Sequence, residues 1–221
     1  QEQQQLLALL DSASALDQLI AQELRSDAAQ FADARRTQVV EGQPVAQALS
    51  EVQLAPSEVI TVVLSQKGWV RAAKGREIDV TALAYKSGDG YLASVSGRSQ
   101  QSAVFFDDTG RAYALPAHTL ASARGFGEPL SGRFTPPAGS QFVSVLLSNA
   151  EDYYVLASSA GYGFICRYEQ LVGRNKAGKA VISLTDGAQL LKPLLTSAPI
   201  EQLQVLAISR SGKMLVFPLS Q

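Results

Sequence analysis

Three short segments of this 221-residue chain combine lysine or arginine with glycine at a nearly constant spacing. They are Lys74–Arg76, Arg124–Gly127 and Arg174–Lys179, and their glycines at positions 75, 125 and 178 step by 50 and 53 residues. Cations on exposed loops contact phosphate oxygens, and equivalent loops of a repeated unit lie along one rim. The pattern therefore predicts a band of positive charge that binds a polyanion.

Two glycine-rich segments imitate nucleotide-binding motifs. Residues 173–180 have the spacing of a phosphate-binding loop, but Ala180 stands where Ser or Thr would ligate Mg²⁺, and Val181–Leu184 is typical of a strand. Gly88–Ala93 fits a dinucleotide fingerprint by spacing, but the residues from Tyr91 alternate as a strand does. Both segments are better explained as turns.

The remaining polar candidates do not form a catalytic or metal site. Asp107–Asp108 and Glu151–Asp152 fall at hairpin connections, where aspartate stabilises turns. His118 is the single histidine, and Cys166, the single cysteine, is best explained as a small apolar residue. We expect no catalytic residue, no metal site and no cofactor within this chain.

Composition indicates a folded protein with an uneven charge distribution. Hydrophobic residues make up 46% and charged residues 18%, which excludes a wholly disordered chain. Residues 1–51 hold three basic and eight acidic groups, whereas the rest hold 16 basic and 12 acidic groups. No apolar run suits a membrane span or signal peptide, so we expect a soluble protein, and its basic second part is the candidate for an anionic partner.

The first part has helical periodicity. Leu16, Ile20, Leu24 and Phe31 recur at helical spacing, and residues 11–14 interrupt the pattern, so we expect two helices. Either serine of that interruption suits an N-cap, and Ser14 with Asp17 has the spacing of a capping box. We assign residues 1–34 to the end of a helical coiled coil and residues 35–57, with Gly42, Pro44 and Pro56, to a linker.

From residue 58 onward, one β-hairpin unit recurs four times. Each copy is an apolar run, a polar turn, a glycine and a second apolar run, and the glycines at 68, 110, 161 and 212 are 42, 51 and 51 residues apart. Glycine after a short polar turn supplies the positive φ that such hairpins need. Strand repeats of this length are typical of propeller-like blades. We therefore predict a mainly β fold over residues 58–221, with at least three blades and an incomplete fourth.

Several segments resemble the C-terminal domains of bacterial type IIA topoisomerase A subunits, the topoisomerase IV branch in particular. They are Val62–Gly75, Ser122–Gly132 and Ala160–Cys166 running into Arg174–Lys179, while Phe31–Thr37 looks like the exit of the preceding coiled-coil arm. The resemblance implies a β-pinwheel of five or six blades that binds and bends DNA along its outer rim. The chain would then be a fragment. The arginine- and glycine-rich box typical of gyrase is absent near Lys74–Glu77.

The resemblance also implies the partners of the parent enzyme. These are double-stranded DNA, the B subunit of topoisomerase IV and a second copy of the A subunit, in a bacterial, nucleoid-associated heterotetramer that uses ATP and Mg²⁺ on other domains. The family cleaves DNA with a tyrosine that follows an arginine, but Arg167–Tyr168 lies in a β-repeat rather than in the family's catalytic domain. We expect a packing role for Tyr168.

The leading hypothesis is a non-catalytic module that binds duplex phosphates and tunes topology preference in strand passage, decatenation and supercoil relaxation. The alternatives are a propeller that binds protein and a nucleotide-dependent enzyme built on the loop at Gly173. The candidate DNA-binding residues are Lys67, Lys74, Arg76, Arg111, Arg124, Arg174, Lys176, Lys179, Arg210 and Lys213.

Overall fold

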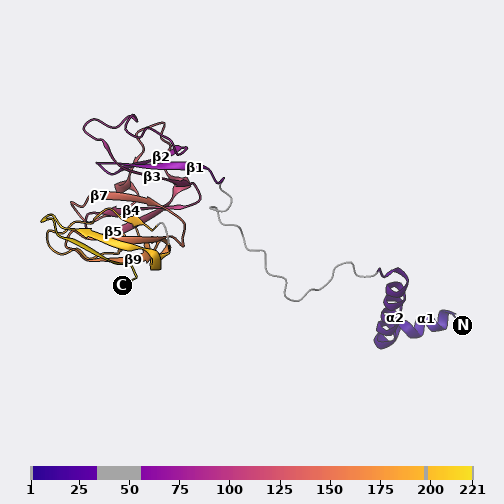
Figure 1. Ribbon diagram of the computed structural model, residues 1–221. Coiled ribbons are helices and arrows are strands. Elements are labelled where there is room, and N and C mark those ends of the chain that lie inside the picture. The colour runs from indigo at the N-terminus through magenta and orange to yellow at the C-terminus, as the bar shows by residue number, and fades with distance from the viewer. Residues whose placement is uncertain (1, 34–55, 197–198, 221) are drawn as a thin grey trace. The chain divides into compact units, whose positions relative to one another are not determined.

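The computed structural model describes residues 2–33, 56–196 and 199–220 of the chain (Figure 1). The chain divides into two compact units, Gln1–Ala48 and Leu49–Gln221. The linker expected at residues 35–57 lies outside the described residues except for its last two positions. No helix of the described ranges is long and apolar enough to cross a membrane.

The first unit contains the two expected helices, α1 (Glu2–Leu10) and α2 (Ala13–Phe31). Ser12 is the N-cap of α2, and its hydroxyl accepts a hydrogen bond from the Ala15 amide at 3.3 Å. The capping box predicted at Ser14 is therefore wrong, because Ser14 already lies within the helix. The apolar stripe of α2 is exposed within its own unit, with Leu24 64% exposed.

The second unit is built from short strands and a few single helical turns. The strands are β1 (Val59–Ser65), β2 (Trp69–Lys74), β3 (Tyr91–Arg98), β4 (Ser102–Asp107), β5 (Arg111–Pro116), β6 (Glu128–Pro129), β7 (Phe142–Leu147), β8 (Tyr153–Ala157), β9 (Gly163–Arg167), β10 (Lys179–Ala180), β11 (Leu194–Leu195), β12 (Gln204–Ile208) and β13 (Met214–Pro218). The turns are η1 (Ala117–Thr119), η2 (Leu130–Gly132), α4 (Tyr168–Leu171) and η3 (Ile200–Gln202).

All four predicted hairpins are present, as β1–β2, β4–β5, β8–β9 and β12–β13. Their turn glycines Gly68, Gly110, Gly161 and Gly212 have φ between 74° and 88°. This left-handed conformation is available to glycine at little cost, which explains why the same residue type recurs at each turn.

In the first two sheets, one edge strand comes from the repeat that follows in the sequence. The strand orders are β3-β1-β2-β6, β10-β5-β4-β7, β11-β8-β9 and β12-β13. The segment after the second hairpin adds β6 to the first sheet, and the segment after the third hairpin adds β10 to the second sheet. We call the edge formed by β6 and β10 the outer edge. The opposite edge, where β3 and β7 lie side by side, is the inner edge.

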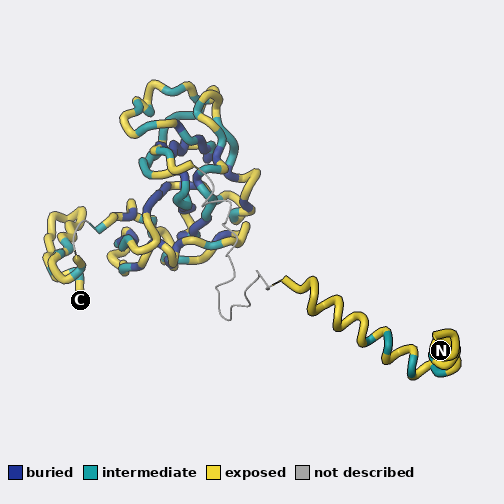
Figure 2. The backbone as a smooth tube through the Cα atoms, turned by 90° about the vertical axis from the view of Figure 1, so that its right-hand side faces the viewer, coloured by how far each residue is buried: buried dark blue, intermediate teal, exposed yellow. Residues whose placement is uncertain are grey.

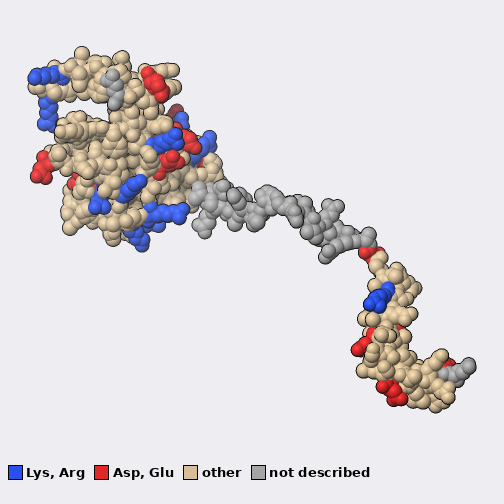
Figure 3. Space-filling model, turned by 90° about the horizontal axis from the view of Figure 1, so that it is seen from below, with Lys and Arg blue, Asp and Glu red and all other residues tan. Residues whose placement is uncertain are grey.

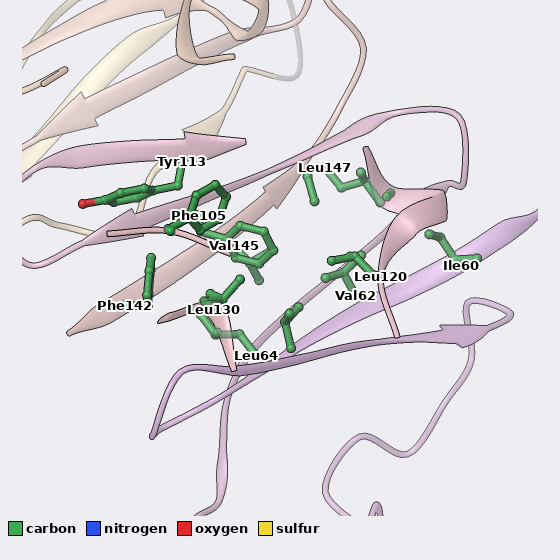
Figure 4. Close-up of a cluster of buried hydrophobic side chains, with 14 residues drawn as sticks. Ile60, Val62, Leu64, Phe105, Tyr113, Leu120, Leu130, Phe142, Val145 and Leu147 are labelled. Carbon is green, nitrogen blue, oxygen red and sulfur yellow. The ribbon is translucent and has the colours of Figure 1, made fainter. Parts of the chain in front are cut away.

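The hydrophobic core lies between successive sheets. Alternate residues of β4 face opposite sides, so that Phe105 packs toward the first sheet whereas Val104 and Phe106 pack toward the third. Figure 4 shows Val62 and Leu64 of β1 opposite Phe105 and Val145 of the second sheet. Figure 2 shows the buried segments gathered in the interior of this unit, with exposed segments around them.

Candidate nucleic-acid interface

The loop that carries Arg124 is fastened along the outer edge of the first sheet. The Ala72 amide donates to the Ala121 carbonyl at 2.8 Å, and the Ala123 amide donates back to the Ala72 carbonyl at 3.0 Å. Five residues after Ala123, Glu128 pairs with Val70 through β6. The segment between these attachments, residues 124–126, is exposed. Arg124 is thus held at the outer edge of this blade.

The loop that carries Arg174 and Lys176 is fastened to the second sheet in the same way. Lys179 pairs with Ala112 through β10, and the Thr135 amide donates to the Lys176 carbonyl at 2.9 Å. The side chains of Arg174, Lys176 and Lys179 are exposed. The Lys179 ammonium donates to the Gln170 carbonyl at 2.7 Å, so its position is fixed as well.

Gly127 and Gly178 occupy equivalent positions in these two loops. Both have positive φ, 88° and 73°, and each lies against the outer strand of the hairpin beside it. A Cβ on Gly127 would meet the Val70 carbonyl, and one on Gly178 would lie 2.5 Å from the Tyr113 ring. Each loop therefore approaches its strand more closely than any other residue type permits. The spacing between the two loops reflects a genuine structural repeat.

The third predicted loop, Lys74–Arg76, does not share that position. The Gly75 amide donates to the Val59 carbonyl, as the Ala117 amide of the next repeat donates to the Gln101 carbonyl. Gly75 is therefore equivalent to Ala117, at the open end of the hairpin, and the prediction of three equivalent basic loops is wrong. Lys74 also forms an exposed ion pair with Glu58 at 2.8 Å.

Of the other predicted cations, Lys67, Arg111, Arg210 and Lys213 lie at hairpin turns or beside them, whereas Arg76 follows β2 at the open end of its hairpin. Lys67 follows β1, and its backbone amide donates to Asp89, whose carboxylate also attracts the Lys67 charge. Arg111 is half-buried and donates to the Ala177 carbonyl at 3.2 Å. Arg76, Arg210 and Lys213 are exposed. Figure 3 shows basic and acidic groups together on the visible face of the β unit, so the charge there is not an unbroken band.

Two cations that the sequence analysis did not select are Arg71, on β2, and Lys86, beside that strand. Arg71 is only 3% exposed, and its guanidinium lies over the Tyr85 ring at 4.6 Å. The Lys86 ammonium lies 3.5 Å above the ring centroid of Trp69. The alternation of β2 is a signal for this arrangement, because Val70 faces the core and its neighbours Trp69 and Arg71 face the other way.

Tyr168 has the packing role expected of it. It is 1% exposed, and its hydroxyl donates to the Ser102 carbonyl at 2.6 Å and also contacts the Leu146 carbonyl at 3.1 Å. Burial raises the pKa of this phenol above its usual value. A buried, protonated hydroxyl cannot reach a phosphodiester, which agrees with the interpretation of Arg167–Tyr168 as an imitation of the catalytic pair.

The acidic and glycine-rich motifs also have the structural roles expected of them. Asp107 is buried and accepts hydrogen bonds from the Thr109 and Arg111 amides and from the Tyr113 hydroxyl. Residues 173–180 end in the strand β10 rather than opening a helix. Within the described ranges no group of three or more His, Cys, Asp or Glu side chains is suited to hold a metal ion.

Comparison with known proteins gives a consistent result. The chain is 50% identical over 219 residues to the A subunit of DNA topoisomerase 4 from Pseudomonas aeruginosa, with 99% of this chain and 29% of that protein covered. The corresponding protein of Escherichia coli is 45% identical, again with 99% of this chain and 29% of the relative covered. The chain thus spans under a third of these relatives. A scan of protein-family models found no match.

Solved structures match the second unit. The C-terminal domain of E. coli ParC superposes with a TM-score of 0.70 at 48% identity, covering 74% of this chain and 66% of that one. The C-terminal domain of DNA gyrase A has the same fold, with a TM-score of 0.53 at 16% identity over 72% of this chain and 54% of that one.

The blades are stacked, and the first two each receive a strand from the following repeat. This arrangement and the matches define a β-pinwheel domain of the class found in type IIA topoisomerase A subunits. The described sheets do not close into a ring. Within that class the chain belongs to the family of topoisomerase IV A subunits, and it corresponds to their C-terminal domain.

Proposed function

We propose that this chain is the DNA-binding and DNA-bending module of a topoisomerase IV, carried on its A subunit. It holds duplex DNA along the outer edges of successive blades and presents the transported segment to the rest of the enzyme. The parent assembly comprises two A subunits and two B subunits in the bacterial cytoplasm, associated with the nucleoid. It performs ATP-dependent strand passage, decatenation and supercoil relaxation, and this module tunes which DNA topology it prefers.

The observation that carries the proposal is the pair of equivalent basic loops at the outer edge. Arg124 on the first blade and Arg174, Lys176 and Lys179 on the second are exposed on loops fastened at both ends. Fixed cations on neighbouring blades suit the regular phosphates of a duplex. They contact the backbone rather than base edges, so binding is independent of sequence apart from the ease of bending.

The test is the affinity of the chain for a duplex of about 30 base pairs, measured from low to high salt. A duplex of this length is bent by 40–90° at a cost of about 1–6 kcal/mol. Neutralising Lys176 and Lys179 together by substitution with alanine removes two phosphate contacts. The slope of log K against log salt is expected to become less steep by roughly 2, because each neutralised phosphate contributes about 0.9.

A matched control removes two charges from the other side of the blades. Arg98 ends β3, and Lys192 lies beside β3 and β7, and both side chains are exposed. The double variant Arg98→Ala and Lys192→Ala has the same net charge as the test variant, and it is expected to retain the wild-type slope. Equal losses in the two double variants, or a wild-type affinity that does not respond to salt, would contradict the proposal.

A further inference from the structure

Arg71 is a buried cation without an acidic partner among the described residues. It is 3% exposed, and no ion pair involves it within the described ranges. Its Nη2 atom is buried without a hydrogen-bond partner. Burying a charged group without a counter-charge costs free energy of folding. Tyr113 occupies the equivalent position of the second hairpin, so a neutral side chain suits this place in the repeat.

The guanidinium of Arg71 joins two loops at the outer edge. Its Nη1 donates to the Ala84 carbonyl at 2.8 Å and to the Gly125 carbonyl at 3.0 Å. Ala84 belongs to the segment that follows the first hairpin, and Gly125 belongs to the segment that follows the second. Tyr85 stacks on the guanidinium and sets its plane. Gly125 is the neighbour of Arg124, so this contact determines where Arg124 is presented.

The second blade has a related contact. Arg111, at the start of β5, donates through Nη1 to the Ala177 carbonyl, and Ala177 is the neighbour of Lys176. In both blades an arginine of the outer hairpin strand therefore holds the backbone of the basic loop beside it. The two arginines occupy different positions of their hairpins, since Arg111 corresponds to Trp69 and Tyr113 to Arg71, so each blade holds its basic loop by a contact of its own.

We propose that Arg71 is a positioning residue of the DNA-binding surface, which orders the 121–129 loop so that Arg124 is presented to the DNA backbone. This inference rests on the proposed function. An ordered loop loses less conformational freedom when it binds, so loosening it weakens the affinity even though Arg71 itself does not reach the phosphates.

The first part of the test needs no DNA. Arg71→Lys keeps the charge, but its shorter side chain lacks the planar guanidinium that stacks on Tyr85 and places Nη1 between the Ala84 and Gly125 carbonyls. Hydrogen exchange of the Ala123 amide, which donates to the Ala72 carbonyl, is expected to accelerate at least fivefold. The Val181 amide, which donates to the Gly110 carbonyl beside the second loop, is the control and is expected to be unchanged. Unchanged exchange at Ala123 would overturn the proposal.

The second part uses a double-mutant cycle on DNA affinity. Arg71→Lys and Arg124→Ala are each expected to weaken binding by about tenfold, and the two together by little more than one alone, because both act through one contact. If the fold-loss of DNA affinity in the double variant equals the product of the two single losses, the proposal is overturned. A wild-type chain that binds no DNA would refute the proposed function and, with it, the DNA-binding role of Arg71, whereas the exchange measurement separately tests the ordering contact.

A second variant covers the case in which Arg71→Lys fails to fold. Tyr85→Leu removes the ring that stacks on the guanidinium and leaves Arg71 in place. It is expected to change the Ala123 exchange rate and the DNA affinity in the same direction by a smaller factor. Wild-type values for both quantities in a folded Tyr85→Leu protein would overturn the proposal.

Discussion

Substitution of Gly178 by alanine tests how tightly the basic loop is fastened to its blade. Gly178 has φ of 73°, and a Cβ there would lie 2.5 Å from Cε1 of Tyr113. The Tyr113 ring has little room to yield, because it is fully buried and its hydroxyl donates to Asp107 at 2.7 Å. Two costs therefore add, one for the backbone conformation and one for the overlap.

The backbone term is about 1–2 kcal/mol, and overpacking a well-packed site costs about 1–3 kcal/mol. Reduced freedom of the unfolded chain offsets about 0.4–1 kcal/mol. The free energy of unfolding is thus expected to fall by about 1–4.6 kcal/mol. Urea unfolding followed through the fluorescence of Trp69 measures this change, since Trp69 is the only tryptophan of the chain.

Gly187 provides the matched control. Its φ is 77°, almost the same as that of Gly178, but an added Cβ would meet nothing within 4 Å. Gly187→Ala therefore has the backbone cost alone, a net loss of about 0–1.6 kcal/mol. Equal destabilisation by the two substitutions would refute the close packing of the loop against Tyr113.

Three further predictions concern single side chains. Burial alone would raise the pKa of Asp89, but hydrogen bonds from Ser65, Gly90 and Lys67 lower it below its usual value of 3.8. Asp89→Asn should therefore cost about 1 kcal/mol at pH 7, and urea unfolding across pH should show the difference from wild type closing as the pH falls below about 4. Tyr168→Phe removes the hydrogen bond to Ser102, so thermal unfolding should report a loss of about 1–3 kcal/mol, with unchanged DNA affinity. Lys74→Ala breaks an ion pair in which the lysine side chain is 81% exposed, so the free energy of unfolding should change by less than about 0.5 kcal/mol.

The repeat and the hairpins were predictable because they depend on local chemistry. Four glycines after polar turns mark four hairpins, and each adopts the positive φ that the turn requires. The pairing of β6 and β10 with the preceding blades could not be predicted from periodicity, since a two-residue strand has none to detect. The sequence left Ser12 and Ser14 open as the helix cap, because both are good capping residues, and the structure selects Ser12 rather than the serine that has the capping-box spacing to Asp17.

The candidate site was only partly predictable. A spacing of about 50 residues placed Arg124 and Lys176 on equivalent loops, but it also included Lys74, which occupies a different point of its repeat. Sequence spacing alone does not distinguish a loop that returns to the previous blade from one that leaves the open end of a hairpin. Arg71 was missed for a related reason, because burial of a charged side chain depends on loops that are distant in the sequence, at Ala84 and Gly125.

The path of DNA over the blades is the central claim, and lysine footprinting tests it most directly. The chain is methylated at its lysines with and without a duplex of about 30 base pairs, and the protection of each lysine is measured by mass spectrometry. Lys176 and Lys179 at the outer edge are expected to be protected by the duplex, whereas Lys192 beside the inner edge keeps its full reactivity. Protection of Lys192 with continued modification of Lys176 and Lys179 would contradict the account.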